Sequence, residues 1–387
     1  MSTDRPSLDT ARTNAPIAAK ASAREVTVPR GPTERLTSLD AFRGFIMLCI
    51  IGGDLLMQRL QHLSSNPVMN AVADQLHHTP WRGLRFYDCI WPCFVLMVGM
   101  SVALSVARRS HTQTYREITL HALKRAMVLF FLSSAIESIN RGSVYIIDVD
   151  GALQQIGVVY FVCFLLVRKS PRFQATAAAL ILAAQGLVEA FAYAPGIPAG
   201  TFEFNHNIVY AVDMAVLGHA QPEGFGTLLP TLPPVSIAIL GLLFGNLLIG
   251  ERSIKSKTLV IGGTGLLCLA AGYALSLWVP VVMKMGTASW GLLAAGWASL
   301  LFMLFFWLVD VRGYRAWSFP LRVIGMNALF IYAFSQLINI DQAMAVFSKA
   351  LVGGSGSSDL LLRSALVLGV EWLLLFWMYR KKIFVRP

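Results

Sequence analysis

The feature that most constrains this chain is a series of long apolar runs separated by short polar segments. A helix needs about twenty mostly apolar residues to cross a bilayer, and we count about ten runs near that length. The runs do not alternate polar and apolar residues, as the strands of a membrane β-barrel would. The sequence therefore predicts an all-α polytopic membrane bundle of about ten transmembrane helices, near residues 41–59, 87–107, 123–139, 152–168, 172–192, 230–249, 258–278, 287–309, 319–339 and 360–379.

Composition agrees with a membrane protein. Hydrophobic residues make up 56% of the chain and charged residues only 14%, whereas soluble domains are about half apolar and a quarter charged. Residues 1–35 are rich in Ala, Arg, Thr and Pro without periodicity and predict a disordered cytoplasmic tail. Residues 36–387 then form one transmembrane domain whose longest outer loops are 60–86 and 193–228. At its start, Thr37 and Asp40 have the spacing of a helix capping box.

The net charge of +11 is distributed as a topology signal. With a cytoplasmic N-terminus, 24 of the 32 Lys and Arg residues fall in inner segments and seven in outer ones, and the outer loop 193–228 has none. This bias predicts that both termini are cytoplasmic. The basic residues are then expected to contact anionic membrane lipid, and the distribution argues against nucleic-acid binding.

Cysteine and histidine usage restricts the chemistry further. All five cysteines fall within predicted spans, and we expect them to be packing residues because an odd number of intramembrane thiols is no disulfide framework. No spacing typical of zinc ligands is present, so we expect no metal. Five of the seven histidines lie in the two long outer loops. Chemistry is therefore expected at the outer face.

Placing a polar side chain inside a predicted span costs free energy, so each such residue is first considered as a functional one. Asp54, Asn140, Gln154 and Asn327 are expected near outer helix ends, where they could line one outward cavity. The alternative is that several of them cap helices or pair with one another.

His78 and Asp88 lie ten residues apart, just before the second predicted span. A neutral imidazole is a natural general base near pH 7, and a carboxylate could orient it as the third member of a triad does. Alternatively, the loop histidine is solvated and Asp88 caps the following helix. Spacing alone leaves both readings open.

Several motifs carry a family resemblance from residue 35 to about 335. They are "RLTSLDAFRGF", "HTPWRGLRFYDCIWPCFVLMVG", "GALQQIGVVYF", "PEGFGTLLPTLPPVSIAILGLLFG" and "GMNALFIY". Together they resemble the membrane acetyltransferases typified by heparan-α-glucosaminide N-acetyltransferase and their bacterial glucosamine-acetylating relatives. The first two motifs are specific in combination, and the others corroborate them.

The resemblance implies acetyl-CoA as cytoplasmic donor and the amine of a glucosamine unit as acceptor across a bacterial inner membrane. The essential histidine of the family maps onto His78, acting as base or as acyl carrier, whereas the neighbouring His77 has no match and should be dispensable. The phosphates of acetyl-CoA need basic contacts near inner helix ends. The candidates are Arg43, Lys124, Arg125 and Arg322, each of which could instead serve topology alone.

Two carboxylates depart from the family pattern. Asp54 stands where relatives carry Asn, and Asp148 replaces a basic residue. They favour a cationic or polyhydroxylated acceptor over a sulfated glycan. The alternatives to an N-acetyltransferase are an O-acetyltransferase of a surface glycan and a non-catalytic sugar transporter or binding protein; any of these could be a homo-oligomer.

Overall fold

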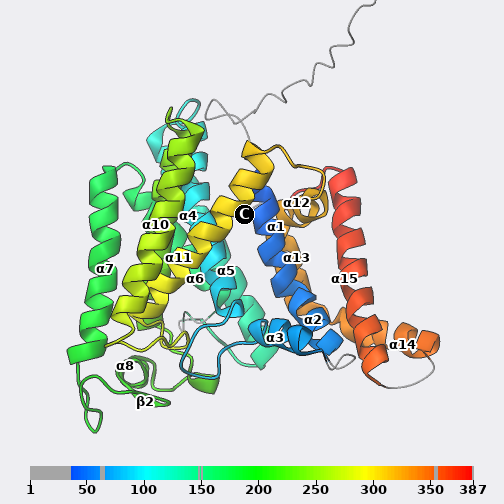
Figure 1. Cartoon of the computed structure of the whole chain (residues 1–387), viewed down its shortest axis with the longest axis horizontal. Coiled ribbons are helices and arrows are strands. Elements are labelled where there is room, and N and C mark those ends of the chain that lie inside the picture. Colours follow the sequence, from blue (N-terminus) through cyan, green and yellow to red (C-terminus); the bar gives the residue numbers. More distant parts are fainter. Residues whose placement is uncertain (1–35, 62–65, 147–148, 150, 353–355, 386–387) are drawn as a thin grey trace, which may run out of the picture.

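A computed structural model describes residues 36–385, except 62–65, 147–148, 150 and 353–355 (Figure 1). The predicted tail 1–35 and Asp148 lie outside the described residues. Within the described part, the chain is helical apart from a hairpin of two short strands, β1 (Phe202–Glu203) and β2 (His206–Asn207), and one isolated bridge. This confirms the all-α prediction.

The helices follow one another through the whole described chain. The first group is α1 (Thr37–Leu48), α2 (Asp54–Gln61), α3 (Pro67–Gln75), α4 (Ile90–Arg109), α5 (Tyr115–Arg141), α6 (Ala152–Leu166) and α7 (Pro171–Phe191). After the hairpin come α8 (Ile208–Leu217), α9 (Leu232–Ile249), α10 (Ile254–Leu275), α11 (Ala288–Phe305), α12 (Phe319–Met326), α13 (Ala328–Leu337), α14 (Ile340–Val352) and α15 (Ser357–Arg380).

The number of uninterrupted spans is smaller than predicted. Every predicted range is occupied by helix, but in the described chain only six helices are long and apolar enough to cross a membrane, and α13 with α14 adds a seventh if that pair, bent by 75°, counts as one span. The first predicted span is broken by a π-helical turn, Cys49–Gly53, where Gly52 has φ 130°. The ninth is broken at Asn327, whose φ of −125° separates α12 from α13. Hydropathy reports how long an apolar run is, and it does not detect breaks in the helix within that run.

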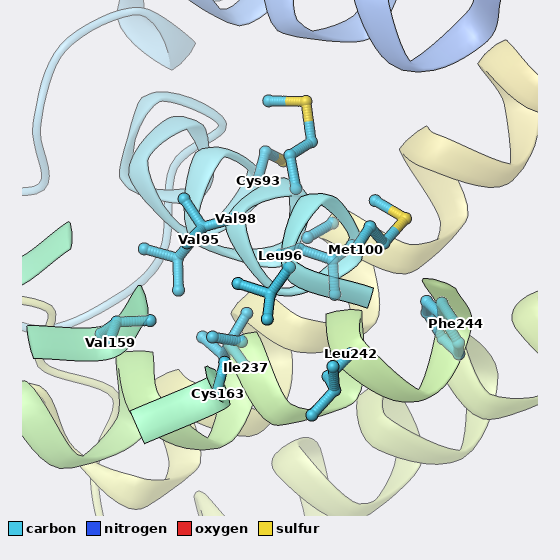
Figure 2. Packing of buried hydrophobic residues seen from close by; sticks show 14 of the residues in the cluster. Cys93, Val95, Leu96, Val98, Met100, Val159, Cys163, Ile237, Leu242 and Phe244 are labelled. Atoms are coloured by element: carbon cyan, nitrogen blue, oxygen red, sulfur yellow. The ribbon is translucent and has the colours of Figure 1, made fainter. Parts of the chain in front are cut away.

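The core lies where α4 packs against α9. Figure 2 shows Leu96 of α4 facing Ile237 and Leu242 of α9 among the apolar side chains of this contact. Gly99 and Gly241 bring the two backbones together, because a Cβ at either position would overlap a carbonyl oxygen of the facing helix. Close approach of this kind is typical of helix packing in membranes.

The first helix begins differently from the sequence expectation. Its N-cap is Leu36, which makes no side-chain cap, so the proposed capping box of Thr37 and Asp40 is wrong. Instead, the backbone N–H of Ser38 donates to the carboxylate of Asp310 at 3.1 Å. A distant span therefore supplies the acceptor that a local side chain was expected to provide.

The bundle has two dissimilar ends. At one end, lowest in Figure 1, lie α2, α3, α8, the β-hairpin and α14; we call this the loop end. The end of α15 and the start of α1 lie in the other half, which we call the terminal end. Around the sides, α7, α10 and α15 expose apolar residues such as Phe191, Leu267 and Leu373, as helices facing lipid do.

Candidate active site

The segment between α3 and α4 is fastened to distant parts of the loop end. The indole of Trp81 donates to the carbonyl of Phe202 at 2.8 Å, and the N–H of Gly83 donates to the carbonyl of Val281 at 2.8 Å. Gly83 has φ 119°, a backbone conformation that residues other than glycine rarely adopt. These contacts explain why Trp and Gly follow His78 at this spacing: they hold the loop in one shape.

Asp88 is the centre of this loop. Its side chain is fully buried, and its two carboxylate oxygens accept four hydrogen bonds. The hydroxyl of Thr79 donates at 2.6 Å, the N–H of Arg85 at 2.9 Å and the N–H of Thr79 at 3.4 Å. The fourth contact joins Asp88 Oδ1 to Nδ1 of His78 at 2.9 Å. All four partners precede the helix, so the carboxylate closes the loop and does not cap α4.

The imidazole of His78 is held on one side and open on the other. Since a carboxylate only accepts hydrogen bonds, Nδ1 is assigned as the protonated nitrogen, which leaves the lone pair on Nε2. The side chain is 47% exposed, and Nε2 makes no hydrogen bond to any described residue. The rings of Tyr87, at 4.7 Å, and Phe225, at 6.4 Å, lie edge-on to it. This arrangement presents a basic nitrogen to an incoming group.

His77 is placed quite differently. It is exposed just after α3, and its side chain makes no hydrogen bond, ion pair or ring contact with another described residue. The two adjacent histidines therefore differ in their surroundings, because only His78 contacts the carboxylate.

Two of the four residues predicted for the acceptor, Gln154 and Asn327, have their side-chain amides bonded within the fold. Gln154 is fully buried, and its amide bonds Ser134, the carbonyl of Ile146 and the N–H of Gly151. Asn327 is also buried, and it binds the C-terminal segment through the carbonyl of Ile383 and the N–H of Val385 at 2.9 and 3.0 Å. Both amides stabilise the fold. Asn140 is exposed at the end of α5, and the side chain of Asp54 lies outside the described residues.

The four basic residues predicted for acetyl-CoA have unequal surroundings. Arg43 contacts Asp40 at 3.5 Å and Ser101 at 3.2 Å, whereas Lys124 is exposed. Arg125 lies over the ring of Tyr160 and Arg322 over that of Phe319, at 4.8 and 5.8 Å from the ring centres. The Nε atoms of Arg125 and Arg322 are buried without a hydrogen-bond partner among the described residues. Because protein atoms cover these two Nε atoms, their lack of a partner does not distinguish Arg125 and Arg322 as ligand contacts.

A small pocket next to Phe225, lined partly by polar side chains, was missed by sequence reasoning. Its volume of about 10 Å³ has room for about one water molecule, and its walls include Asn207, Tyr210, Asp213 and Gln221. Gln221 is buried and accepts hydrogen bonds from Arg141 at 3.1 Å and the Tyr145 hydroxyl at 2.9 Å, while its Nε2 has no partner among the described residues. These residues lie in the histidine-containing loop 193–228, and its lack of Lys and Arg was the one signal that could have marked it.

Lys284 lies between the wall of this pocket and the surroundings of the His78 imidazole. Its ammonium group is nearly buried, donates to the carbonyl of Glu223 at 3.0 Å and lies 5.0 Å from the centre of the Phe225 ring. The ring that lies beside His78 is thereby held in place by a cation from the segment between α10 and α11.

Other polar chemistry is sparse. The five cysteines are free, four of them buried, which agrees with packing roles. In the described ranges, no three His, Cys, Asp or Glu side chains gather as metal ligands would.

These features define a class: a polytopic membrane protein with a carboxylate–imidazole pair at one end of its helix bundle. Residues 35–279, more than half the chain, match the family described as heparan-alpha-glucosaminide N-acetyltransferase, catalytic. The chain belongs to this family, as its motifs predicted. A human protein named heparan-alpha-glucosaminide N-acetyltransferase is 21% identical over 415 residues, an alignment that covers 90% of this chain and 59% of the human one. The chain thus spans about three fifths of that relative.

Proposed function

We propose that this protein is a transmembrane N-acetyltransferase that moves an acetyl group from acetyl-CoA to the amine of glucosamine or of a glucosamine-containing saccharide. One observation carries the proposal: an exposed imidazole whose Nδ1 lies 2.9 Å from a buried carboxylate. Family membership supports acetyl transfer as the reaction.

The geometry suits a base that accepts a proton at Nε2. The amine nitrogen attacks the thioester carbonyl, the C–S bond breaks, and coenzyme A leaves as a thiolate. His78 takes the proton from nitrogen and returns it to the thiolate sulfur, while Asp88 holds the tautomer and stabilises the imidazolium. The alternative is that Nε2 itself carries the acetyl group between two half-reactions, since imidazole is a competent acyl carrier.

Donor and acceptor belong at opposite ends of the bundle in this proposal. Arg43, Lys124, Arg125 and Arg322 are the candidates to contact the phosphates of acetyl-CoA. The acceptor then approaches the open side of the His78 imidazole, which is 47% exposed, because the pocket with Gln221, at about 10 Å³, is too small to hold a sugar. The loop end then faces the periplasm and the C-terminus the cytoplasm of a bacterial inner membrane. A reporter fused after Pro387 that is active only in the periplasm would overturn this orientation.

Purified protein with acetyl-CoA and glucosamine tests the reaction by mass spectrometry of the product. We expect N-acetylglucosamine and free coenzyme A in equal amounts. A trapped protein bearing acetyl on His78 after incubation with acetyl-CoA alone would indicate the two-step route. An O-acetylated product, or none, would contradict the proposal.

The donor site is tested by measuring coenzyme A binding to Arg125→Ala and Arg322→Ala variants. We expect each to weaken binding, with His77→Ala as the unaffected control. Unchanged affinity in both arginine variants would remove these two arginines from the donor site.

A further inference from the structure

A short amphipathic helix lies across the loop end, directly before the catalytic loop. This helix, α3, is capped by Asn66, whose side chain accepts from the N–H of Val68 at 2.9 Å. It runs across the direction of the long helices in Figure 1. Two of its apolar side chains point away from the protein: Val68 is 71% exposed and Val72 42% exposed. Exposed valines on a helix at this position call for an apolar neighbour.

An open groove of about 710 Å³ runs along this helix. Its lining is apolar: Pro67, Val68, Ala71, Val72, Leu76 and Phe86. Gln75 also borders it, but its side-chain oxygen accepts from the N–H of Phe86 at 3.1 Å. The carbonyl of Leu76 is likewise taken by the side chain of Gln58 at 2.8 Å. The groove therefore offers hydrocarbon surface, and a sugar alone would gain little from entering it.

The groove is continuous with the catalytic pair. Leu76 precedes His78 by two residues, and Phe86 precedes Asp88 by two residues, so both walls lead into the loop that holds the imidazole. The candidate membrane span Tyr87–Arg109 begins immediately after Phe86. The groove thus lies where the bilayer surface meets the active site, and the apolar material available there is a lipid chain.

We propose that this groove binds the hydrocarbon chain of a membrane-anchored acceptor, placing its amino-sugar headgroup at Nε2 of His78. The preferred substrate is then an amphiphilic glucosaminide rather than free glucosamine. This inference rests on the proposed acetyl transfer for its catalytic part, and on the shape and lining of the groove for its binding part.

The test uses the full chain in lipid nanodiscs and three probes: methyl, hexyl and decyl glucosaminide. Affinity and acetyl transfer are measured separately for each probe. We expect hexyl glucosaminide to bind at least about tenfold more tightly than the methyl form, since burial of methylene groups is favourable. Val68→Asn and Val72→Asn should remove most of that difference. The matched control is Val216→Asn, because Val216 is 64% exposed on α8 at the same end and lies outside the groove.

The outcomes separate the two proposals. The proposal that the groove binds the chain is overturned if affinity is independent of chain length. It is also overturned if the chain-length effect persists in both groove variants. The proposal is also overturned if the groove binds chains but the ratio of kcat/KM for hexyl glucosaminide to kcat/KM for glucosamine is the same in the valine variants as in the wild type. The bound chain is then unrelated to the acceptor. Chain-dependent binding without acetylation of any probe keeps the groove and contradicts the proposed function instead.

Discussion

Asp88 and Asp213 are two buried carboxylates at the loop end with nearly the same immediate surroundings. Each is 2% exposed, and each accepts from both the hydroxyl and the backbone N–H of a threonine. Asp213 bonds Thr227 at 2.9 and 2.8 Å and the N–H of Leu228 at 3.3 Å. Asp88 has the corresponding bonds to Thr79 and to the N–H of Arg85, and in addition it contacts His78.

The difference between the Asp88 and Asp213 clusters separates a structural role from a proposed catalytic role. A buried carboxylate with several neutral donors is a sound way to close a loop, because each donor compensates part of the desolvation cost. Asp213 does this and no more. Asp88 does the same and also faces an exposed imidazole, so one carboxylate serves both the loop and the base. Variants of the two clusters should therefore agree in stability and differ in turnover.

The largest effect is expected from His78→Ala. Loss of the base should lower kcat by roughly 10²–10⁴-fold, while coenzyme A binding and the thermal unfolding midpoint stay near the wild type, because the imidazole is half exposed. His77→Ala should leave kcat unchanged. Steady-state kinetics at equal protein concentration measure both, and substantial turnover by His78→Ala would sink the mechanism.

The pair Asp88→Asn and Asp213→Asn tests the comparison directly. An amide in place of either carboxylate presents an NH₂ group to donors that need an acceptor, so each variant should lose about 1–3 kcal/mol of unfolding free energy. Only Asp88→Asn should also lower kcat per folded molecule, by roughly 10²-fold or more, because the imidazole loses its orienting partner. Equal kinetic losses in the two variants would mean that Asp88 is structural only.

Gln221→Ala probes whether the Asp213 side of the loop end takes part in acceptor binding. Gln221 is buried beside a pocket of about 10 Å³, which is too small for a sugar. We therefore expect a loss of about 1 kcal/mol of unfolding free energy from its hydrogen bonds to Arg141 and Tyr145, with kcat and both KM values unchanged. A rise in the acceptor KM would show that the Asp213 side contributes to acceptor binding.

The smallest effects are expected from Thr79→Val and Thr227→Val. Each removes one hydroxyl donor to a buried carboxylate and should cost about 1 kcal/mol of unfolding free energy. Thr79→Val should also lower kcat a few-fold by loosening Asp88, and Thr227→Val should not. Chemical denaturation and kinetics on the same preparations provide both readings; a larger loss of stability in Thr227→Val would show that the clusters are not equivalent.

Much of the helical organisation was predictable from the chain itself. Apolar length is a local property of a segment, and the bilayer forces any such segment into a helix because its backbone groups have no other partner there. All ten predicted ranges are helical for this reason. The interruptions at Gly52 and Asn327 were not predicted, since a break can be tolerated where neighbouring helices bury it.

The candidate site was likewise predictable from the sequence only in part. The motif led to the prediction that His78 and Asp88 act together, and their side chains lie in contact at 2.9 Å. Polar residues without a motif were less informative: Gln154 and Asn327 looked like site residues, yet their amides bond backbone groups of a loop and of the C-terminal segment. Gln221 gave no individual signal at all.

By itself, then, the sequence determined the membrane setting, the helical ranges and the family, because these depend on residues close together in the chain. Only the tertiary structure decided which polar groups are consumed by the fold and which remain open. Asp310 reaches the start of α1, and Phe225 and Lys284 meet beside His78, through contacts between residues far apart in sequence. A buried polar group must find a partner wherever the packed helices place one, and a linear pattern does not record that geometry.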